Sequence, residues 1–327
     1  MTAARLKIPD LIQELESLLR QLPEGRVTTF GSLARALGDV TAARWVAQVL
    51  RSGTIAVDCP AHRVVMKSGE IGGTETDRQI RQLAAEGIPI QNGAVDLDTF
   101  GFDDWKSSEP LCSLKNHQDR LPAQIELSVY RETPEEIAGV DLSYLDDGTA
   151  VACYAVVETA TGRLIWSETV HRRVAFPYIS GYLAYRELPI LLDLIEHVQS
   201  RRALTDVVFV DGNGILHPRR GGIASHLGVT ADLRTVGVGK KQLCGKVDLS
   251  QVTPKEPQPI LDGDEEIGRA IKAEVESRPI FVSPGHKIDV KNAARLTRLL
   301  FHGHRLPEPI YHADAISRRE AKALQLL

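Results

Sequence analysis

The sequence has few cysteines, and they show no arrangement typical of a metal or redox site. Its four cysteines are Cys59, Cys112, Cys153 and Cys244, and none belongs to a CxxC pair. Zinc-binding and thioredoxin-like functions are therefore disfavoured. The irregular spacing favours free thiols in a reducing compartment.

Long apolar runs and an excess of basic charge are also missing. No apolar stretch reaches the roughly 18 residues of a membrane span, and Met1 to Asp10 lacks the apolar core of a secretory signal. We therefore expect a soluble intracellular protein. The net charge of -4 is not that of a protein held to nucleic acid by bulk charge. Any nucleic-acid contact must come from local patches such as Lys240-Lys241.

The length and composition are those of a globular protein with two domains. The chain has 327 residues, of which 43% are hydrophobic and 25% charged. Residues 105–113 mix aromatic, acidic, serine and proline residues, which is typical of a linker. We place a first domain at residues 1–104 and a second at 114–327.

The first domain is predicted to be mainly helical. Leucines and isoleucines recur with a helical period over Leu11–Leu22. Two shorter helices, at 30–37 and 41–50, are separated by Gly38, and the second is expected to be capped by Asp39 or Thr41. This spacing indicates a helix-turn-helix. An extended stretch at 55–65 and a helix at 77–87 follow.

The second domain alternates predicted strands and helices, which indicates an α/β domain with a mixed sheet. A long helix is expected over about 180–200. Strands are predicted at 137–142, 151–157, 164–170, 207–211, 234–238 and 279–283.

Two of these strands run directly into an aspartate. Ile137-Ala138-Gly139-Val140 precedes Asp141, and Val207-Val208-Phe209-Val210 precedes Asp211 and glycines. If the strands pair, both carboxylates can reach one Mg²⁺, which prefers oxygen ligands. Glu187 and Asp314 could complete the shell or hold a water. Such a metal would suit phosphodiester chemistry.

Several motifs of the second domain resemble endonuclease V, in that family's order. They include the two aspartate motifs, Pro177-Tyr178-Ile179-Ser180-Gly181, the run from Gly221 to Gly228, Val236 to Lys240 and Val282 to His286. The resemblance implies a ribonuclease-H-like mixed sheet with flanking helices. It also implies an Mg²⁺-dependent enzyme, with Mn²⁺ as a substitute, that cleaves nucleic acid 3′ to deoxyinosine or inosine.

The resemblance assigns roles to individual residues. Asp141, Asp211 and Glu187 would bind the metal, and Asp314 matches a fourth position that is Asp or His. His312 would face the same side as Asp314 if the segment is extended. Lys240 would lie near the scissile phosphate, and His217 would contact a phosphate or water, or hold its loop by a hydrogen bond. The strand-separating wedge would be Pro177, Tyr178, Ile179 and Ser180, where Ser180 replaces the usual second proline. The extruded base would be held by Gly181, Leu183, Gly212 and Ile223.

The first domain resembles the DNA-binding domain of O6-alkylguanine-DNA alkyltransferases. The motifs are Gly25 to Ala34, Ala42-Ala43-Arg44 and Pro60-Ala61-His62-Arg63-Val64-Val65. Ala61 stands where that family has its nucleophilic cysteine, so direct alkyl transfer at this position is excluded. The substitution is typical of alkyltransferase-like proteins, whose winged helix-turn-helix domain binds and flips O6-alkylguanine without repairing it. The lesion-binding residues would be Phe30, Arg44, Ala61, His62 and Arg63.

The leading prediction is therefore a DNA repair enzyme, a Mg²⁺-dependent endonuclease V joined to a non-catalytic alkyl-lesion reader. Its expected partners are DNA with hypoxanthine or O6-alkylguanine lesions, and its expected location is the cytoplasm and nucleoid. Three alternatives stay open. They are a lesion-recognition scaffold with a weak nuclease, an inosine-specific endoribonuclease, and an alkyltransferase that uses Cys59, which would face the same side as Ala61 in an extended segment.

Overall fold

The computed structural model describes residues 8–72 and 76–326, which form two compact units. The N-terminal unit contains residues 8–117 together with 175–182, and the C-terminal unit contains 118–174 and 183–326. Helix α6 (Pro110–Arg120) begins inside the segment predicted to be a linker. Across the described ranges, no helix has the length and apolar character needed to cross a membrane.

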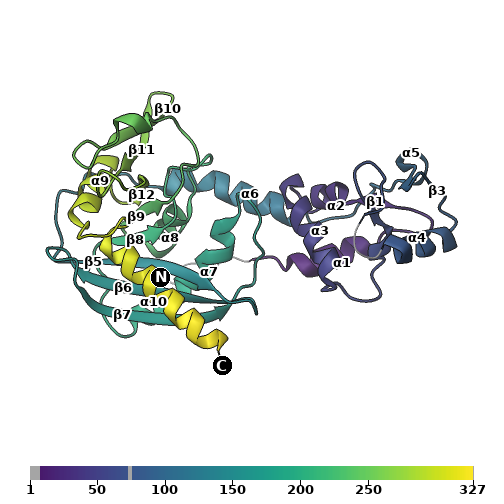
Figure 1. Ribbon diagram of the computed structural model, residues 1–327, viewed down its shortest axis with the longest axis horizontal. Coiled ribbons are helices and arrows are strands. Elements are labelled where there is room, and N and C mark those ends of the chain that lie inside the picture. The colour runs from purple at the N-terminus through teal and green to yellow at the C-terminus, as the bar shows by residue number, and fades with distance from the viewer. Residues whose placement is uncertain (1–7, 73–75, 327) are drawn as a thin grey trace. The chain divides into compact units, whose positions relative to one another are not determined.

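Three helices form the first half of the N-terminal unit, as predicted (Figure 1). They are α1 (Leu11–Leu19), α2 (Phe30–Ala36) and α3 (Ala43–Ser52), and the 3-10 turn η1 (Val40–Ala42) leads into α3. Asp39 caps this turn, because its Oδ1 accepts a hydrogen bond from the Thr41 amide at 2.9 Å. The predicted helix-turn-helix is therefore present, with Asp39 as the cap.

The second half of the N-terminal unit consists of short elements. The parallel pair β1 (Thr28–Thr29) and β2 (Val64–Val65) precedes α4 (Thr76–Ala85), and the hairpin β3 (Ile90–Gln91) and β4 (Ala94–Val95) precedes α5 (Leu97–Phe100). The extended stretch predicted for 55–65 is wrong over most of its length. Residues 61–63 form the 3-10 turn η2 (Ala61–Arg63), since the Arg63 amide donates to the Pro60 carbonyl at 3.0 Å.

The C-terminal unit is built on an eight-stranded mixed sheet, which confirms the predicted α/β class. The six predicted strands are present, most of them longer than expected, whereas β10 and β11 were not predicted. The strand order is β10-β11-β12-β9-β8-β5-β6-β7. The strands are β5 (Glu136–Tyr144), β6 (Thr149–Glu158), β7 (Leu164–Arg173), β8 (Val208–Asp211), β9 (Thr235–Gly239), β10 (Gln258–Asp262), β11 (Glu265–Ile271) and β12 (Ile280–His286).

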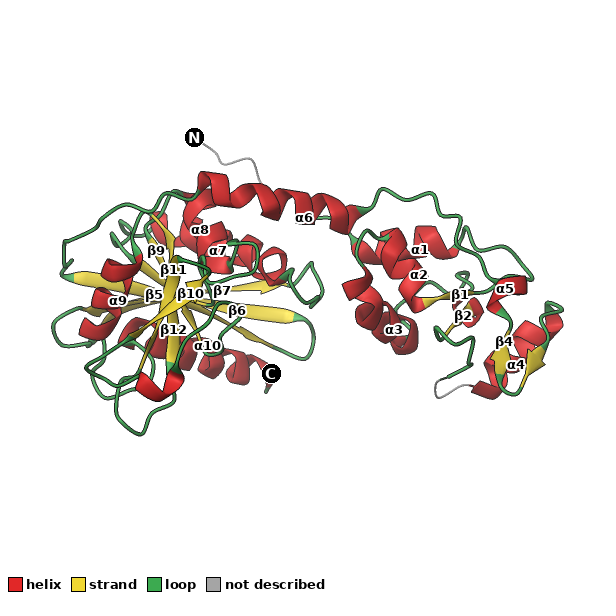
Figure 2. Cartoon of the chain, turned by 90° about the horizontal axis from the view of Figure 1, so that it is seen from above, coloured by secondary structure: helices red, strands yellow, loops and turns green. Residues whose placement is uncertain are grey.

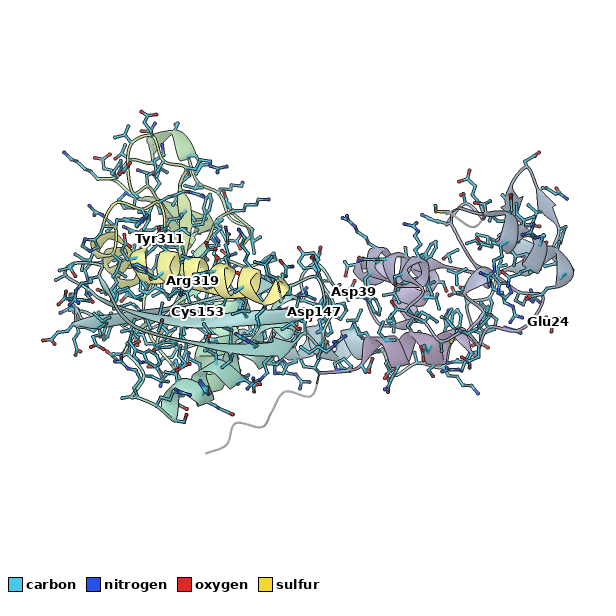
Figure 3. All side chains as sticks on the ribbon, turned by 60° about the horizontal axis from the view of Figure 1, so that its bottom comes forward. Glu24, Asp39, Asp147, Cys153, Tyr311 and Arg319 are labelled. Carbon is cyan, nitrogen blue, oxygen red and sulfur yellow. The ribbon has the colours of Figure 1, made fainter. Side chains whose placement is uncertain are left out.

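Helices cover both faces of this sheet (Figure 2). Helices α7 (Leu183–Gln199) and α8 (Ile223–Ala231) pack on the face that carries Ala138 and Val140. Helices α9 (Val290–Leu299) and α10 (Glu308–Gln325) pack on the other face, where α10 covers Cys153 (Figure 3). The 3-10 turns η3 (Leu121–Gln124) and η4 (Leu249–Gln251) lie in connections. Because side chains alternate along a strand, Asp141 projects to the α10 face.

Helix α10 approaches β5 closely because residue 139 is glycine. A Cβ atom at Gly139 would lie 2.3 Å from the carbonyl carbon and oxygen of Pro309, near the start of α10. No side chain fits in that space. Gly139 thus lets the last described helix lie directly on the strand that carries Asp141.

Candidate active site

The two aspartates predicted to share a metal come from neighbouring parallel strands. In the register of β5 and β8, Val140 pairs with Val210, so Asp141 and Asp211 occupy the next position of each strand. Strands β5 and β8 therefore pair, which is the condition under which both carboxylates can reach one cation. Asp211 ends β8, but β5 continues past Asp141 to Tyr144, because its partner β6 pairs with it that far. The strand predicted at 137–142 therefore extends two residues beyond its expected end.

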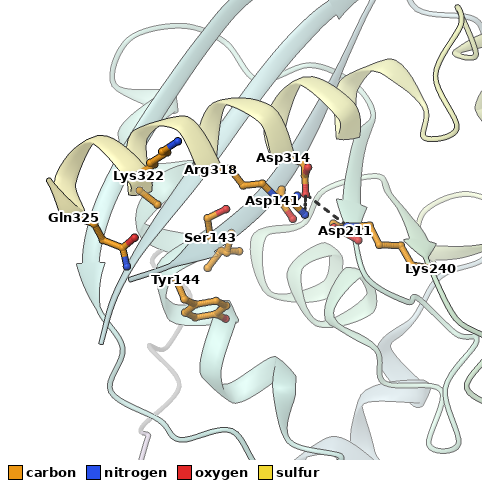
Figure 4. A pocket seen from close by; sticks show the side chains of 11 residues that line it. Asp141, Ser143, Tyr144, Asp211, Lys240, Asp314, Arg318, Lys322 and Gln325 are labelled. Atoms are coloured by element: carbon orange, nitrogen blue, oxygen red, sulfur yellow. Dashed lines mark hydrogen bonds and ion pairs between the residues drawn. The ribbon is translucent and has the colours of Figure 1, made fainter. Parts of the chain in front are cut away.

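The third carboxylate comes from helix α10 (Figure 4). One oxygen from each of Asp141, Asp211 and Asp314 lies within 4.8 Å of the other two. The segment around Asp314 is helical rather than extended, so the condition under which His312 would face the same side as Asp314 is not met. His312 turns instead to Glu308, one helical turn earlier, at 3.6 Å.

The electrostatics of this cluster show concentrated negative charge. Burial, together with the nearby carboxylates of Asp211 and Asp314, raises the pKa of Asp141 well above its usual value. The Lys240 ammonium pairs with Asp211 and lies 3.7 Å from Asp314, whose carboxylate also accepts from Arg318 at 2.9 Å. Cations from two sides thus partly balance the acids.

The donor set fits a hard divalent cation. Three carboxylates converge from two strands and a helix, and Asp141 is only 7% exposed. A buried carboxylate beside two others is costly to ionise unless a positive charge joins it. Asp141, Asp211 and Asp314 would therefore hold the cation, with oxygen ligands of the kind that Mg²⁺ prefers.

Glu187, predicted as a metal ligand, lies outside this group of three. It is on α7, which packs on the opposite face of the sheet, and its carboxylate accepts a hydrogen bond from the Tyr144 hydroxyl at 2.8 Å. Burial raises the pKa of Glu187 to about 7, and the charge of Asp211 adds to the effect. Its role at the metal stays a prediction, and its carboxyl group is suited to exchanging a proton near neutral pH.

A cavity of about 610 Å³ opens beside the three carboxylates. Its wall includes side chains that the sequence motifs did not single out, above all on α10, where the spacing of four residues places them along one face (Figure 4). The sequence signal that could have identified them is the pair of basic residues, Arg318 and Lys322, that follow Asp314 by one and two helical turns. The additional lining residues are Ser143, Tyr144, Arg318, Ala321, Lys322 and Gln325.

Two other predicted residues occupy the loop after β8. His217 accepts a hydrogen bond at Nδ1 from the Arg219 amide at 3.2 Å, so the loop-stabilising alternative is present. Burial and the neighbouring arginines lower the pKa of His217 to about 4, which keeps the ring neutral at pH 7. Of the predicted base pocket, Gly212 and Ile223 lie together, since a Cβ atom at Gly212 would meet Ile223 Cγ2 at 2.3 Å. Leu183 begins α7.

The predicted wedge belongs to the N-terminal unit rather than to the C-terminal one. Residues 175–182, which include the wedge residues 177–180 and Gly181, cluster with that unit. Tyr178 is 68% exposed, whereas Ile179 is 2% exposed. The aromatic ring is therefore presented at the surface of an anchored segment and is not part of a core.

Of the predicted lesion-binding residues, Arg44 is exposed to solvent, whereas His62 and Arg63 are held by hydrogen bonds within the domain. Arg44 is exposed on α3 and Phe30 begins α2. His62 and Arg63 directly follow Ala61, and both bind Glu86, at 2.6 Å from His62 Nε2 and 2.8 Å from Arg63 Nε.

Glu86, which follows α4, was not predicted to have a role. Although burial would raise the pKa of Glu86, the hydrogen bonds from Arg63 and His62 hold it below its usual value. The turn that presents Ala61 is thus held by a partly buried group of hydrogen bonds that includes the Arg63–Glu86 ion pair.

Cys59 has the environment of an inert thiol. It is a free cysteine, only 7% exposed, and burial raises its pKa. Nucleophilic cysteines need a lowered pKa and access to solvent. The structure therefore weighs against alkyl transfer to Cys59.

Comparisons with known proteins agree with this architecture. The endonuclease V family model matches residues 119–315, and the model of the 6-O-methylguanine DNA methyltransferase DNA binding domain matches 11–88. A bifunctional methyltransferase/endonuclease of Picrophilus torridus is 35% identical over 299 residues, which cover 90% of this chain and 92% of the relative.

Solved structures resemble the C-terminal unit. The catalytic domain of human endonuclease V is 33% identical, covers 68% of this chain and 100% of its own, and superposes with a TM-score of 0.62. Endonuclease V of Ciona intestinalis is 28% identical, covers 66% of this chain and 100% of its own, and has a TM-score of 0.60. That structure holds a 24mer DNA containing an inosine followed by a ribo-adenosine.

The mixed sheet and its acidic cluster define an endonuclease that acts on phosphodiester bonds. More particularly, the chain belongs to the endonuclease V family, and an alkyltransferase-like DNA-binding domain is fused to its nuclease. It is a DNA repair endonuclease with two DNA-binding parts.

Proposed function

We propose that the protein cleaves DNA 3′ to deoxyinosine with Mg²⁺ held by Asp141, Asp211 and Asp314. The observation that carries the proposal is the convergence of these three carboxylates within 4.8 Å at the edge of a cavity. A bound cation would supply an activated water and would stabilise negative charge on the phosphate. Mn²⁺ would substitute, because it also accepts oxygen ligands.

The residues around the cluster have distinct roles in this proposal. Lys240 balances the charge of Asp211 and Asp314 and would lie near the scissile phosphate. Glu187, whose pKa is raised to about 7 by burial, would take up or release a proton close to neutral pH. His217 stays neutral and holds the loop after β8 through its bond with the Arg219 amide.

The lesion base would be selected after it leaves the stack. Tyr178, which is 68% exposed, would enter the duplex and replace the lost stacking. Gly212 and Ile223 would contact the extruded purine, where the small glycine lets backbone groups approach its edge. Hypoxanthine pairs weakly, so its extrusion costs less than that of a normal base.

The alkyltransferase-like domain would bind O6-alkylguanine and flip it without chemical change. Arg44 is exposed on the recognition helix α3, where it can fill the gap left by a flipped base. Ala61 offers no nucleophile, and the buried thiol of Cys59 does not replace it. We place this activity in the cytoplasm, on the nucleoid.

Incision of end-labelled DNA tests the proposal. Duplexes with one hypoxanthine, one O6-methylguanine or neither would be incubated with Mg²⁺ or with EDTA. We expect Mg²⁺-dependent cleavage 3′ to hypoxanthine. Cleavage of the O6-methylguanine duplex as well would mean that the reader directs the nuclease to alkyl damage. Absence of hypoxanthine cleavage would contradict the proposal, and parallel assays with inosine-containing RNA would then separate a ribonuclease from a scaffold.

A matched pair of variants links cleavage to the site. Asp141→Ala removes the buried carboxylate of the cluster and is expected to abolish cleavage. Asp146→Ala removes an exposed carboxylate from the same hairpin and should leave cleavage unchanged. Equal activity of the two variants would exclude the assigned metal site.

A further inference from the structure

The segment that bears the wedge is anchored by one tyrosine. Tyr182 closes residues 175–182, and its side chain is 1% exposed. Its hydroxyl donates a hydrogen bond to Asp39 Oδ2 at 2.7 Å and lies 3.4 Å from the Leu111 carbonyl oxygen. All three residues belong to the N-terminal unit. The end of the wedge-bearing segment is therefore fixed to the turn of the helix-turn-helix.

The other carboxylate oxygen of Asp39 caps the turn that leads into the recognition helix α3. Its Oδ1 accepts from the Thr41 amide at 2.9 Å and caps η1, which leads into α3 with Arg44. Although burial would raise the pKa of Asp39, hydrogen bonds from Thr41 and Tyr182 hold it below its usual value. One ionised carboxylate thus joins the start of the recognition helix to the wedge-bearing segment.

The surroundings of this contact are rigid. Gly38 adopts a left-handed conformation with φ of +102°, and a Cβ atom there would lie 2.5 Å from the Cys112 amide nitrogen. The Leu111 amide in turn donates to the Leu37 carbonyl at 2.8 Å. The turn at residues 37–39 and the start of α6 are therefore closely packed beside the Tyr182 hydroxyl.

The geometry of the wedge-bearing segment suits a fixed support. Phe176 and Ile179 are 1% and 2% exposed, while Tyr178 between them is 68% exposed. Two buried side chains and the Tyr182 hydroxyl hold the segment, and one aromatic ring projects. The Tyr178 ring can enter a base stack effectively only if the protein segment that carries it stays in place.

We propose that Tyr182 is a positioning residue, which through Asp39 makes the nuclease wedge part of the lesion-reading domain. This inference rests on the proposed function. DNA bound along α3 and the ring of Tyr178 then share one rigid support, so the reader domain sets how well the enzyme opens a duplex. Chemistry at the three carboxylates does not depend on the contact.

Comparing duplex with single-stranded substrates isolates strand opening. Initial rates of cleavage would be measured on hypoxanthine in a duplex and in a single strand, which needs no opening. Tyr182→Phe removes the hydroxyl bond to a carboxylate, and we expect the ratio of duplex to single-strand rates to fall about tenfold. Tyr178→Ala should lower the same ratio. Tyr154→Phe, which removes a buried hydroxyl 2.9 Å from Thr205, is the matched control and should keep the wild-type ratio.

A second pair of variants identifies the contact itself. Asp39→Ser keeps a side-chain oxygen that can cap η1 but is too short to reach Tyr182. We expect it to lower the ratio as much as Tyr182→Phe does, and the double variant to fall no further. An unchanged ratio in Tyr182→Phe, or additive effects in the double variant, would overturn the inference. If the wild type cleaves neither substrate, the proposed function has failed instead.

Discussion

The Ser317 hydroxyl of α10 donates a hydrogen bond to Asp141 Oδ2 at 3.0 Å, so the helix that supplies one carboxylate also orients another. Ser143, on the same face of β5 as Asp141, lies 2.9 Å from Ser317 Oγ and extends this network. The site is therefore supported by contacts between α10 and β5 as well as by its three acids.

Removing the Ser317 hydroxyl should weaken metal binding more than folding. Groups that orient a ligand contribute about tenfold or more to metal affinity. We expect Ser317→Ala to raise the Mg²⁺ concentration for half-maximal cleavage by about tenfold. Ser143→Ala keeps the direct hydrogen bond from Ser317 to Asp141, so it should change this Mg²⁺ concentration less. A titration of cleavage against Mg²⁺ gives both values, and equal values for wild type and Ser317→Ala would contradict the assignment.

Adding one methyl group at Gly139 should separate α10 from the sheet. The new Cβ atom would lie 2.3 Å from the Pro309 carbonyl, so the helix must move. We expect Gly139→Ala to lose at least about 1–3 kcal/mol of unfolding free energy and most of its activity. Gly31→Ala in α2, where the nearest contact would be 3.7 Å, is the control. Thermal unfolding measures the difference, and equal melting temperatures would show that α10 is not closely packed there.

Glu187 should make stability depend on pH. Its pKa is about 7 in the folded protein and 4.5 in the unfolded chain, so the folded state binds the proton more tightly. The resulting stabilisation is complete below pH 4.5 and is lost as the pH rises through about 7. It amounts to about 3 kcal/mol. Metal-free Glu187→Gln should therefore be more stable than the wild type at pH 8, as measured by denaturant unfolding. A Gln variant with the wild-type pH dependence would exclude this titration.

The basic residues of α10 should contribute to binding of the DNA backbone. Arg318 and Lys322 line the cavity beside the three carboxylates. Each phosphate contact contributes a slope of about one to the dependence of log affinity on log salt concentration. We expect Arg318→Ala and Lys322→Ala each to raise KM and to reduce this slope by about one. Arg319→Ala, on the same helix but outside the cavity lining, is the control. Equal slopes for all three variants would exclude the predicted contacts.

The sequence predicted most of the elements that carry the site. Apolar runs before Asp141 and Asp211 located β5 and β8, whereas their pairing was only a condition of the predicted metal site and is seen in the structure. Short polar strands such as β10 have no such run and were missed. The sequence patterns predict no helix around Asp314, and an extended segment is one interpretation there. The prolines of this segment are compatible with the observed helix, because Pro309 occupies the first turn of α10, where proline is tolerated.

Contacts between distant segments were beyond the reach of sequence patterns. Nothing in the local sequence places Ser317 beside Asp141 or Tyr182 beside Asp39, because these pairs depend on how helices pack on the sheet and on the turn. Likewise, Glu187 has the motif of a metal ligand, yet its carboxylate contacts Tyr144 and lies on the other face. The motifs supplied the candidate residues, whereas packing determines which of these residues lie together.

The position of α10 along the chain has a consequence for synthesis. Asp141 and Asp211 emerge from the ribosome about a hundred residues or more before Asp314, which completes the cluster only when α10 docks on β5. Helices α2 and α3 of the alkyltransferase-like domain emerge earlier still. A nascent chain therefore contains the helices of its alkyltransferase-like domain while the carboxylate cluster of its nuclease still lacks one acid.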